Sequence, residues 1–244
     1  MSADRYAAER RQGELIAAGQ EHVWGWSGPA GELRASRRAR FLIDQAELGP
    51  GIRCLELGCG TGEFTTRLAA SGCELVAVDL SEATAAVARD RVGDSAEVIV
   101  GNIETGEGLE GREFDAVVGV SVLHHVDVHS CLETIVPLVR PGGRLAFTEP
   151  NRLNPQVWAE RHLEPLRRLR HVLPHETAFR ARELRSIFEH HGLDVDVAEP
   201  FDFLHHVTPA RLVRPVQRLE RVLERTPLRE IAGSVRIAAR RPRA

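Results

Sequence analysis

A glycine-rich loop between an apolar segment and a helical segment constrains this chain more than any other feature. Residues 54–57 form a short apolar run that contains one acid, Glu56, and a helical pattern starts at Glu63. Between them stand Gly58, Gly60 and Gly62. Glycines at alternate positions let a backbone turn tightly and lie against a ligand where any Cβ would collide. The first turn of the helix offers unpaired N–H groups to the same ligand. The pattern predicts a strand–loop–helix unit that holds a nucleotide cofactor.

Two nucleotide cofactors compete for this loop. The dinucleotide-binding fingerprint needs a third glycine at the position of Glu63, and a carboxylate there repels a pyrophosphate. The observed spacing, with Glu56 two residues before Gly58, instead resembles motif I of the class I S-adenosylmethionine (SAM) methyltransferases. SAM carries a sulfonium and an ammonium group, which nearby acids favour. The loop therefore favours SAM over NAD, and a glycine turn that binds nothing is the remaining alternative.

A second apolar segment, residues 73–79, ends in an acid that suits a ribose. Asp79 lies 21 residues after Gly58, at the expected tip of the adjacent parallel strand. A carboxylate there accepts both ribose hydroxyls in NAD and SAM enzymes alike. The alternative role of Asp79 is to cap the helix that follows, but Ser81 suits that role better. We therefore expect Asp79 to bind the ribose.

Three later blocks extend the resemblance. Residues 96–104 are similar to the family's third-strand block, in which an acid and a small apolar residue bracket the adenine. Asn102 stands where an acid is commonest, and its amide can still accept from the adenine amino group and donate to a ring nitrogen; a glycine–asparagine turn is the alternative. Residues 114–126 and 141–150 resemble the fourth- and fifth-strand blocks. Five blocks in the right order over residues 50–150 carry the resemblance.

The resemblance implies that SAM, and its product S-adenosyl-L-homocysteine (SAH), contact the loop and the strand tips. The implied cofactor-binding residues are Glu56, Gly58, Cys59, Gly60, Gly62, Asp79, Leu80, Asn102, Ile103 and Ser121. No metal site is predicted, because the four cysteines form no C-x-x-C pair and no histidine cluster completes a zinc pattern. We interpret the cysteines as reduced and the protein as cytoplasmic.

The ends of the fourth and fifth strands carry the candidate catalytic residues His124, His125 and Glu149. Ligands of an open parallel sheet bind beyond the carboxyl ends of its strands. Methyl transfer is an in-line displacement that needs near-attack geometry, and an oxygen acceptor benefits from a base such as histidine. We predict that His124 or His125 is this base and that Glu149 orients it. The alternatives are packing or helix capping for the histidines and a purely structural acid.

Other aromatic side chains have two open interpretations each. Trp24 and Trp26 either close over the cofactor or pack in an ordinary turn. One of His162, His171 and His175 is a candidate to face the substrate, although most histidines suit the surface. The pair His205-His206 either lines the pocket or packs in the core.

Composition limits the classes of function. All 32 basic residues are arginine, which excludes lysine Schiff-base and lysine-nucleophile chemistry. Residues 1–150 hold 14 arginines and 23 acids, whereas residues 151–244 hold 18 arginines and 12 acids. The acidic half suits a cationic cofactor, and the basic half indicates solvated helix faces or, alternatively, affinity for an anionic substrate or a membrane surface. We expect no signal peptide and no membrane span, because no apolar run reaches about 18 residues.

Strands and helices alternate from residue 52 to residue 149, which predicts parallel strands with helical crossovers on both faces. With the resemblance, this gives an α/β fold: a Rossmann-like, seven-stranded, mostly parallel sheet with an antiparallel last strand. The 244 residues suit one domain with a full core. Its parts are an N-terminal helical lid (1–49), a SAM-binding core (50–150), a substrate cap (151–177) and a C-terminal completion of the sheet (178–244). Outside the core we expect helices over 4–18, 31–47, 156–172, 181–191 and 209–225, and strands over 193–198 and 234–239.

The motifs are most similar to the ubiquinone/menaquinone-biosynthesis and natural-product methyltransferases. The resemblance implies methyl transfer from SAM to a small molecule, and the histidine pair favours a hydroxyl oxygen. N- or C-methylation of a metabolite, lipid or quinone is the alternative. A SAM-binding protein that does not methylate and an NAD-linked oxidoreductase are the other classes considered. No nucleic-acid partner is expected, because the chain has neither an appended nucleic-acid module nor an N/D-P-P-Y tetrad near the fourth strand.

Overall fold

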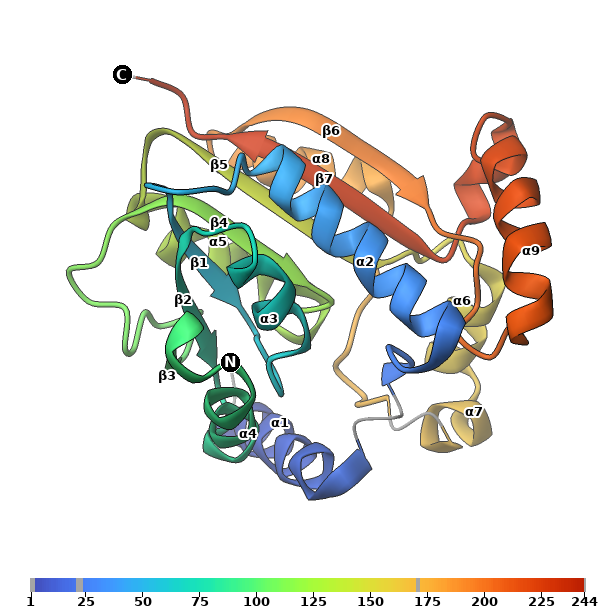
Figure 1. Ribbon diagram of the computed structural model, residues 1–244, viewed down its shortest axis with the longest axis horizontal. Helices are drawn as coiled ribbons and strands as arrows, with labels where there is room; N and C mark the ends of the chain where they lie inside the picture. Colours follow the sequence, from blue (N-terminus) through green and yellow to red (C-terminus); the bar gives the residue numbers. More distant parts are fainter. Residues whose placement is uncertain (1–2, 21–23, 170–171, 244) are drawn as a thin grey trace.

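A twisted, mostly parallel sheet forms the centre of the molecule. The computed structural model describes residues 3–20, 24–169 and 172–243. Seven strands lie in the order β3-β2-β1-β4-β5-β7-β6 (Figure 1). Strands β1 to β5 run parallel, and β7 is antiparallel to both of its neighbours. The predicted α/β fold with an antiparallel last strand is therefore confirmed.

The first five strands follow the predicted blocks. Their central residues are apolar and buried, as in a parallel sheet that is covered on both faces. The strands are β1 (Arg53–Leu57), β2 (Glu74–Asp79), β3 (Glu97–Val100), β4 (Phe114–Val120), β5 (Val139–Pro150), β6 (Asp194–Phe201) and β7 (Ser234–Arg240). The strand order changes direction at β1, which is paired with β2 on one side and β4 on the other. Ligand sites of open sheets lie at such a switch point.

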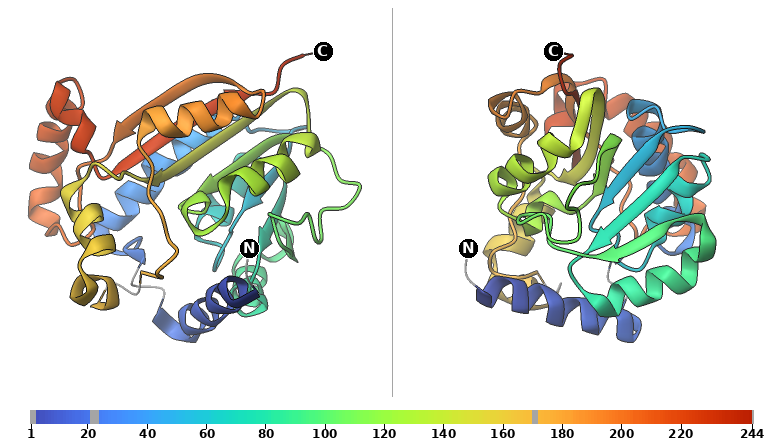
Figure 2. Two further views of the ribbon diagram at one scale, coloured as in Figure 1. Left: turned by 180° about the vertical axis from the view of Figure 1, so that it is seen from behind. Right: turned by 90° about the vertical axis from the view of Figure 1, so that its left-hand side faces the viewer.

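Helices cover both faces of the sheet (Figure 2). Helices α2 (Gly28–Gln45), α3 (Glu63–Ala69) and α4 (Glu82–Val92) lie on one face, and α5 (Val128–Ile135) and α8 (Ala181–His190) lie on the other. Alternate strand residues point to the two layers. Leu55 and Val117 pack in the core layer that contains α5 and α8, whereas their neighbours Cys54 and Ala116 pack in the layer of α2 and α3.

The N-terminal helix lies across the carboxyl ends of the first strands. Helix α1 (Ala3–Leu15) continues into the π-helical turn η1 (Ile16–Gln20), in agreement with the helix predicted over residues 4–18. It packs on the start of α4, where a Cβ added to Gly13 would lie 2.4 Å from Ser81 Oγ. The glycine thus allows the helix to approach closely. The short helical turns of the core are η3 (Gly93–Ser95), η4 (Leu123–His125) and η5 (Val136–Leu138).

The segment after β5 differs from the prediction. One helix was expected over residues 156–172, but the structure has two, α6 (Pro155–His162) and α7 (Glu164–Leu169). Leu163 between them has extended backbone angles. Pro165 has no N–H to continue the first helix and suits the first turn of a new one. The prediction of a single helix is therefore wrong, and Pro165 accounts for the break.

The C-terminal elements complete the sheet. Strand β6 runs three residues past its predicted end through Pro200, which an edge strand tolerates because one side needs no N–H. Helix α9 (Ala210–Leu223) forms as predicted despite Pro215, and the turn η6 (Pro227–Ile231) leads into β7. Among the described residues, no helix has both the length and the apolar content that crossing a bilayer requires.

Candidate cofactor and active site

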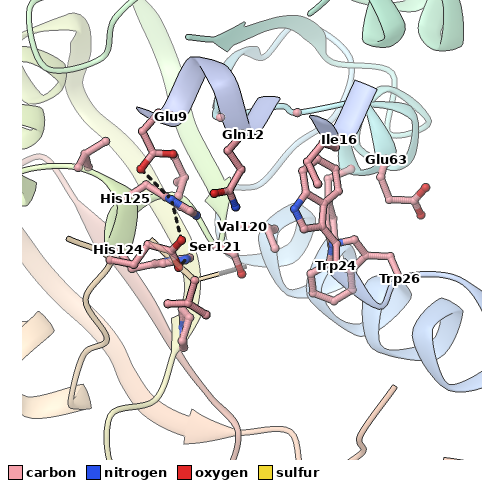
Figure 3. Close-up of a pocket in the computed structure, with 18 of the residues that line it drawn as sticks. Glu9, Gln12, Ile16, Trp24, Trp26, Glu63, Val120, Ser121, His124 and His125 are labelled. Carbon is pink, nitrogen blue, oxygen red and sulfur yellow. Dashed lines mark hydrogen bonds and ion pairs between the residues drawn. The ribbon is translucent and has the colours of Figure 1, made fainter. Parts of the chain in front are cut away.

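A cavity of about 480 Å³ lies beyond the carboxyl ends of β1 to β4, beneath α1. Glu9 and Gln12 of α1 and Ile16 of η1 line it (Figure 3). Trp24 and Trp26 lie on one side of it and the histidines after β4 on the opposite side. Both tryptophans therefore lie where residues that close over a ligand are expected. The position of the cavity agrees with the rule for ligand sites of parallel sheets.

Most of the residues predicted from the sequence line this cavity. They are Gly58, Cys59, Gly60, Asp79, Leu80, Asn102, Ile103, Ser121, His124 and His125. Three predicted residues do not line it and lie behind its wall: Glu56, Gly62 and Glu149.

The glycine loop, here called the glycine cradle, borders the cavity and has no room for side chains at Gly58 and Gly60. Gly58 and Gly60 have φ of +63° and +53°, which non-glycine residues rarely adopt. A Cβ added to Gly58 would lie 2.5 Å from Val122 Cγ2, and one added to Gly60 would lie 2.8 Å from the Trp24 ring. The bare backbone of this loop is therefore required both by its conformation and by its close neighbours.

Asp79 holds the glycine loop against the tip of β2. Its Oδ2 accepts a 2.8 Å hydrogen bond from Gly60 N–H, and its Oδ1 accepts from Ser81 N–H and Thr84 Oγ1. Ser81 is the N-cap of α4, as predicted, and Asp79 supports the same helix end. Burial raises the pKa of Asp79, and these three hydrogen bonds oppose that rise. Asp79 thus has a structural role in addition to its predicted contact with a ribose.

Two of the predicted cofactor residues lie behind the loop. Glu56 is buried, and burial raises the pKa of its carboxyl to about 8. Within the described part of the chain, Glu56 Oε2 has no hydrogen-bond partner. Gly62 has a positive φ, and a Cβ there would lie 3.2–3.3 Å from Ala88 and Val92 of α4. Gly62 therefore permits close packing of the loop on α4.

Two strand tips contribute strained or turn-forming residues. Asn102 Oδ1 accepts a 3.0 Å hydrogen bond from Glu104 N–H, so the alternative turn role is present and the adenine role stays a prediction. Ser121 has φ of +52° immediately after β4, and its N–H donates to Thr148 O at 2.7 Å. Non-glycine residues in this region cluster at functional sites.

A buried carboxylate organises the turn after β4. Glu149 accepts hydrogen bonds from the backbone N–H groups of Val122, Leu123 and His124, and it lies 2.8 Å from His124 Nδ1. Burial raises the pKa of Glu149 to about 7 and lowers the pKa of His124, which the charge of His125 lowers further. The lowered pKa makes His124 neutral at pH 7. Because Glu149 already accepts from three backbone N–H groups, we assign the ring proton of His124 to Nδ1 and leave Nε2 unprotonated. The predicted orienting contact between Glu149 and a histidine is present.

The neighbouring histidine has the opposite character. Burial lowers the pKa of His125, but Glu176 and Glu9 outweigh this effect and raise it to about 9. Glu9 Oε1 lies 3.2 Å from His125 Nδ1 and 2.6 Å from His175 Nε2. Burial raises the pKa of Glu9, but the two histidines lower it to about 2. His125 is therefore a cation near neutral pH that joins α1 to the turn after β4.

The N-terminal end of α1 makes a second set of polar contacts. Arg5 forms an ion pair with Glu104 and donates to the backbone oxygen of His125 at 3.1 Å. Tyr6 Oη donates to the same Glu104 carboxylate at 3.2 Å. Arg5, Tyr6 and Glu104 all line the cavity. Helix α1 therefore forms the roof of the cavity.

The end of the cavity away from the glycine loop is bordered by α6 and the segment before α9. Val157, Arg161, Phe203 and Leu204 line it. His205 and His206 also line it, in agreement with one of their two interpretations, and His175 reaches Glu9. His162 stacks on Trp158 at the exposed side of α6, and His171 lies outside the described residues.

Several site residues were not predicted from the sequence. Glu9 and Arg161 lie far from the motifs, Glu104 is the last residue of the 96–104 block, and Glu176 lies in the segment 172–180. Nothing local distinguishes them from surface charges, because only the fold brings them to the strand tips. His124, His125 and Glu176 have potential ligand atoms within 4.8 Å of one another. The prediction that no metal binds stays a prediction.

Residues 55–147 match the family model described as a methyltransferase domain. A ubiquinone biosynthesis O-methyltransferase of Xanthomonas axonopodis pv. citri (strain 306) is 32% identical over 148 residues, which cover 58% of this chain and 62% of that protein. The chain thus spans about six tenths of the length of the curated relatives that it matches.

Solved structures share the fold at lower identity. The [4+2]-cyclase SpnF has a TM-score of 0.69 and 17% identity, with 96% of both chains covered. The N-methyltransferase NodS from Bradyrhizobium japonicum WM9, solved in complex with SAH, has a TM-score of 0.65 and 16% identity over 96% of this chain and 98% of that one. Residues 55–147 are therefore similar to a methyltransferase domain, and the chain shares its fold with solved SAM-dependent methyltransferases.

Proposed function

We propose that this chain transfers a methyl group from SAM to a small-molecule acceptor, with a hydroxyl oxygen as the receiving atom. The observation that carries the proposal is the juxtaposition, in one cavity, of the glycine cradle, Asp79 and a neutral, carboxylate-oriented histidine. The relatives named ubiquinone biosynthesis O-methyltransferases support an oxygen acceptor.

The residues present fit SAM. A Cβ at Gly58 or Gly60 would collide with Val122 or Trp24 at the cavity wall. The loop therefore borders the cavity as bare backbone, which a ligand can approach to van der Waals distance. Acidic side chains of the cavity wall, among them Asp79 and Glu104, complement a ligand with two positive charges. When bound, SAM supplies a methyl group on a sulfonium for in-line displacement. We assign the ribose to Asp79, the adenine to Asn102 and Ile103, and the amino-acid end to the glycine loop.

We assign the proton transfer to His124 rather than to His125. Neutral His124 has its Nδ1–H directed at Glu149, which leaves Nε2 to accept the proton of an acceptor hydroxyl. His125 already holds its proton near neutral pH, since Glu176 and Glu9 raise its pKa. Glu149 holds the ring of His124 in place and selects the tautomer.

A specific observation supports a second candidate. The structure of SpnF, whose fold this chain shares, is described as that of a cyclase. The fold alone therefore does not decide the reaction, and a SAM-binding protein that does not methylate is the alternative. N- or C-methylation of a metabolite, lipid or quinone is the alternative within methyl transfer.

We also propose a cytoplasmic location, where the four free cysteines stay reduced, and no nucleic-acid partner.

Calorimetry and label transfer test the proposal in two steps. We expect SAM and SAH to bind with micromolar affinity and NAD not to bind; absence of SAM and SAH binding contradicts the proposal. Labelled SAM with a panel of phenols, catechols, amines and activated carbon acids then identifies the acceptor.

With that acceptor, His124→Asn should lower kcat by about 10²- to 10⁴-fold without changing the affinity for SAH. Equal activity of His124→Asn and the wild type excludes the assigned base. Binding without transfer to any of the compounds favours the second candidate.

A further inference from the structure

Exposed apolar side chains gather at one end of the molecule. Among the described residues, nine of the eleven large apolar side chains that are exposed fall between residues 158 and 231. Helix α9 and the turn η6 carry five of them, here called the α9 patch: Leu212, Leu219, Val222, Leu228 and Ile231. Leu219 and Val222 are 57% and 59% exposed. Large exposed apolar patches mark contact surfaces rather than ordinary solvated faces.

Helix α9 has three stripes along its length. Its buried stripe contains Val213 and Glu220 and faces α2, where Arg37 pairs with Glu220 at 2.5 Å. The second stripe is apolar and exposed, at positions 212, 215, 219 and 222. The third stripe is exposed and basic, with Arg211, Arg214, Arg218 and Arg221. The exposed stripes share the spacing i, i+3, i+7, i+10, so each forms one line on the helix surface.

The basic stripe is not neutralised by the acids of its own helix. Glu220 and Glu224 both pair with Arg37 of α2, at 2.5 and 3.1 Å. In the part of the chain that the structure describes, none of the four stripe arginines pairs with an acidic side chain. The exposed surface of α9 is therefore apolar along one line and cationic along the next.

We propose that the α9 patch docks this protein on the surface of an anionic lipid bilayer. A helix that lies in a membrane interface needs an apolar face to enter the acyl boundary and arginines beside it to meet lipid phosphates. Both are present here as adjacent stripes. A second copy of the chain fits less well, because a two-fold contact between α9 helices would bring the arginine stripes toward each other. A nucleic acid would leave the apolar stripe without a partner.

The α9 patch also adjoins elements that line the cavity. Asn154 at the start of α6 donates to Ile231 O at 2.8 Å, and Gln156 lies 2.8 Å from His205, just before α9. Asn154, Gln156 and His205 all line the cavity. Figures 1 and 2 show α6 and α9 side by side at this end of the molecule. Docking would therefore bring one side of the cavity close to the bilayer.

Flotation of the full chain with vesicles tests the proposal without any acceptor or cofactor. We expect binding to vesicles of phosphatidylcholine with about one third phosphatidylglycerol, and at least 10-fold weaker binding to pure phosphatidylcholine. Salt at about 1 M, where the Debye length is about 3 Å, should weaken binding to the anionic vesicles. Failure to bind anionic vesicles overturns the proposal and leaves the proposed methyl transfer untouched.

Two variants separate the stripes. Arg214→Gln/Arg218→Gln should weaken partition into anionic vesicles by about 30-fold, since each arginine near the surface contributes about 5-fold. Leu219→Gln/Val222→Gln should weaken it by at least 10-fold. Arg180→Gln/Arg182→Gln, which removes the same charge from exposed positions at the start of α8, is the matched control and should change binding by less than about 3-fold.

Circular dichroism and SAH calorimetry establish that the variants are folded. Equal vesicle binding by the two arginine variants would show that net charge alone drives adsorption, which overturns a role for α9. A wild-type dimer in light scattering that Leu219→Gln/Val222→Gln abolishes, without vesicle binding by either protein, would assign the patch to a second copy instead.

Discussion

Two adjacent histidines differ in what each can do with a proton. His124 is buried against Glu149, and burial together with the charge of His125 lowers its pKa. His125 lies between Glu9 and Glu176, which raise its pKa to about 9 against the effect of burial. Of these two consecutive residues, His124 can accept a proton and His125 is a cation near neutral pH. No sequence pattern distinguishes the two histidines.

Nuclear magnetic resonance of the imidazole nitrogens checks this difference. At pH 7 we expect His124 to be the neutral tautomer that carries its proton on Nδ1, and His125 to be doubly protonated. Of these two histidines, only His125 should titrate between pH 7 and 10, with its midpoint near 9. A protonated His124 at pH 7 would contradict the assignment of the base.

The glycine cradle supports a second prediction. Gly60→Ala should weaken SAH binding by at least about 10-fold, because its Cβ would displace the Trp24 ring beside the cavity and stand on the loop backbone. Gly51→Ala is the matched control, since Gly51 has φ of +84° and no atom within 4 Å of an added Cβ. Calorimetry with SAH should show a loss for Gly60→Ala alone, while thermal melting shows a loss of stability for both, since a left-handed conformation costs an alanine roughly 1–2 kcal/mol. Equal affinity in the two variants would exclude the close approach.

At the scale of elements, helix α1 is held over the cavity mainly by charge. Glu9 contacts His125 and His175, and Arg5 pairs with Glu104. The pKa of His125 is raised from 6.5 to about 9, so its contribution to docking is complete below pH 6.5 and is lost as pH rises through 9. The pKa of Glu9 is lowered from 4.5 to about 2, so its contribution is lost as pH falls through this range. Docking of α1 should be strongest between pH 4.5 and 6.5.

Hydrogen exchange measures this docking. We expect the amide protection of residues 4–15, after correction for intrinsic rates, to fall by about 10- to 100-fold between pH 6.5 and 10. Glu9→Gln should be less protected at pH 6.5 and should lose less protection on going to pH 10. Residues 131–135 of α5, which are outside the contact, serve as the internal reference. A pH-independent protection of α1 in the wild type would contradict the account.

The elements differ in how far sequence could predict them. The glycine loop, the five parallel strands and Ser81 as a helix cap follow from local patterns, and all are present. The break at Pro165 was missed, although proline without an N–H gives a local signal for it. The contacts of Glu9 and Glu176 with the histidines could not be predicted, because they arise only when α1 and the segment 172–180 fold over the strand tips. The spacing of the motif assigns Gly62 to the cofactor. In the structure, the atoms that a Cβ at Gly62 would crowd belong to α4.

At the scale of the whole molecule, a buried ion pair joins the N-terminal helices to the antiparallel end of the sheet. Arg38 of α2 lies 2.6 Å from Asp202 after β6, and both side chains are 2% exposed. Arg38 also donates to Ser234 Oγ at the start of β7. Burial lowers the pKa of Arg38 to about 10, which leaves it charged at neutral pH. Removal of Asp202 leaves the buried charge of Arg38 without a carboxylate, whereas removal of Arg38 leaves Asp202 with Arg34, at 3.1 Å, as its remaining partner.

A double-mutant cycle tests this link. Arg38→Met should destabilise the protein by about 3 kcal/mol, and the cycle with Asp202→Asn should give a coupling of more than about 1 kcal/mol. The exposed pair Arg240–Asp196, at 3.0 Å, is the control and should give less than about 0.5 kcal/mol in the corresponding cycle. Chemical denaturation measures both. Similar couplings for the two pairs would show that burial does not strengthen the α2 link.

The roof formed by α1 has a kinetic consequence. Its contacts reach the segments after β2 and β3 at Ser81 and Glu104, and the opposite side of the cavity at His125 and His175. A single helix therefore covers both sides of the cavity. We predict that cofactor product and methylated acceptor leave when α1 is displaced, a step that involves no bond chemistry, so turnover should slow as solvent viscosity rises. A turnover rate that depends on the nucleophilicity of the acceptor and not on viscosity would contradict this role of α1.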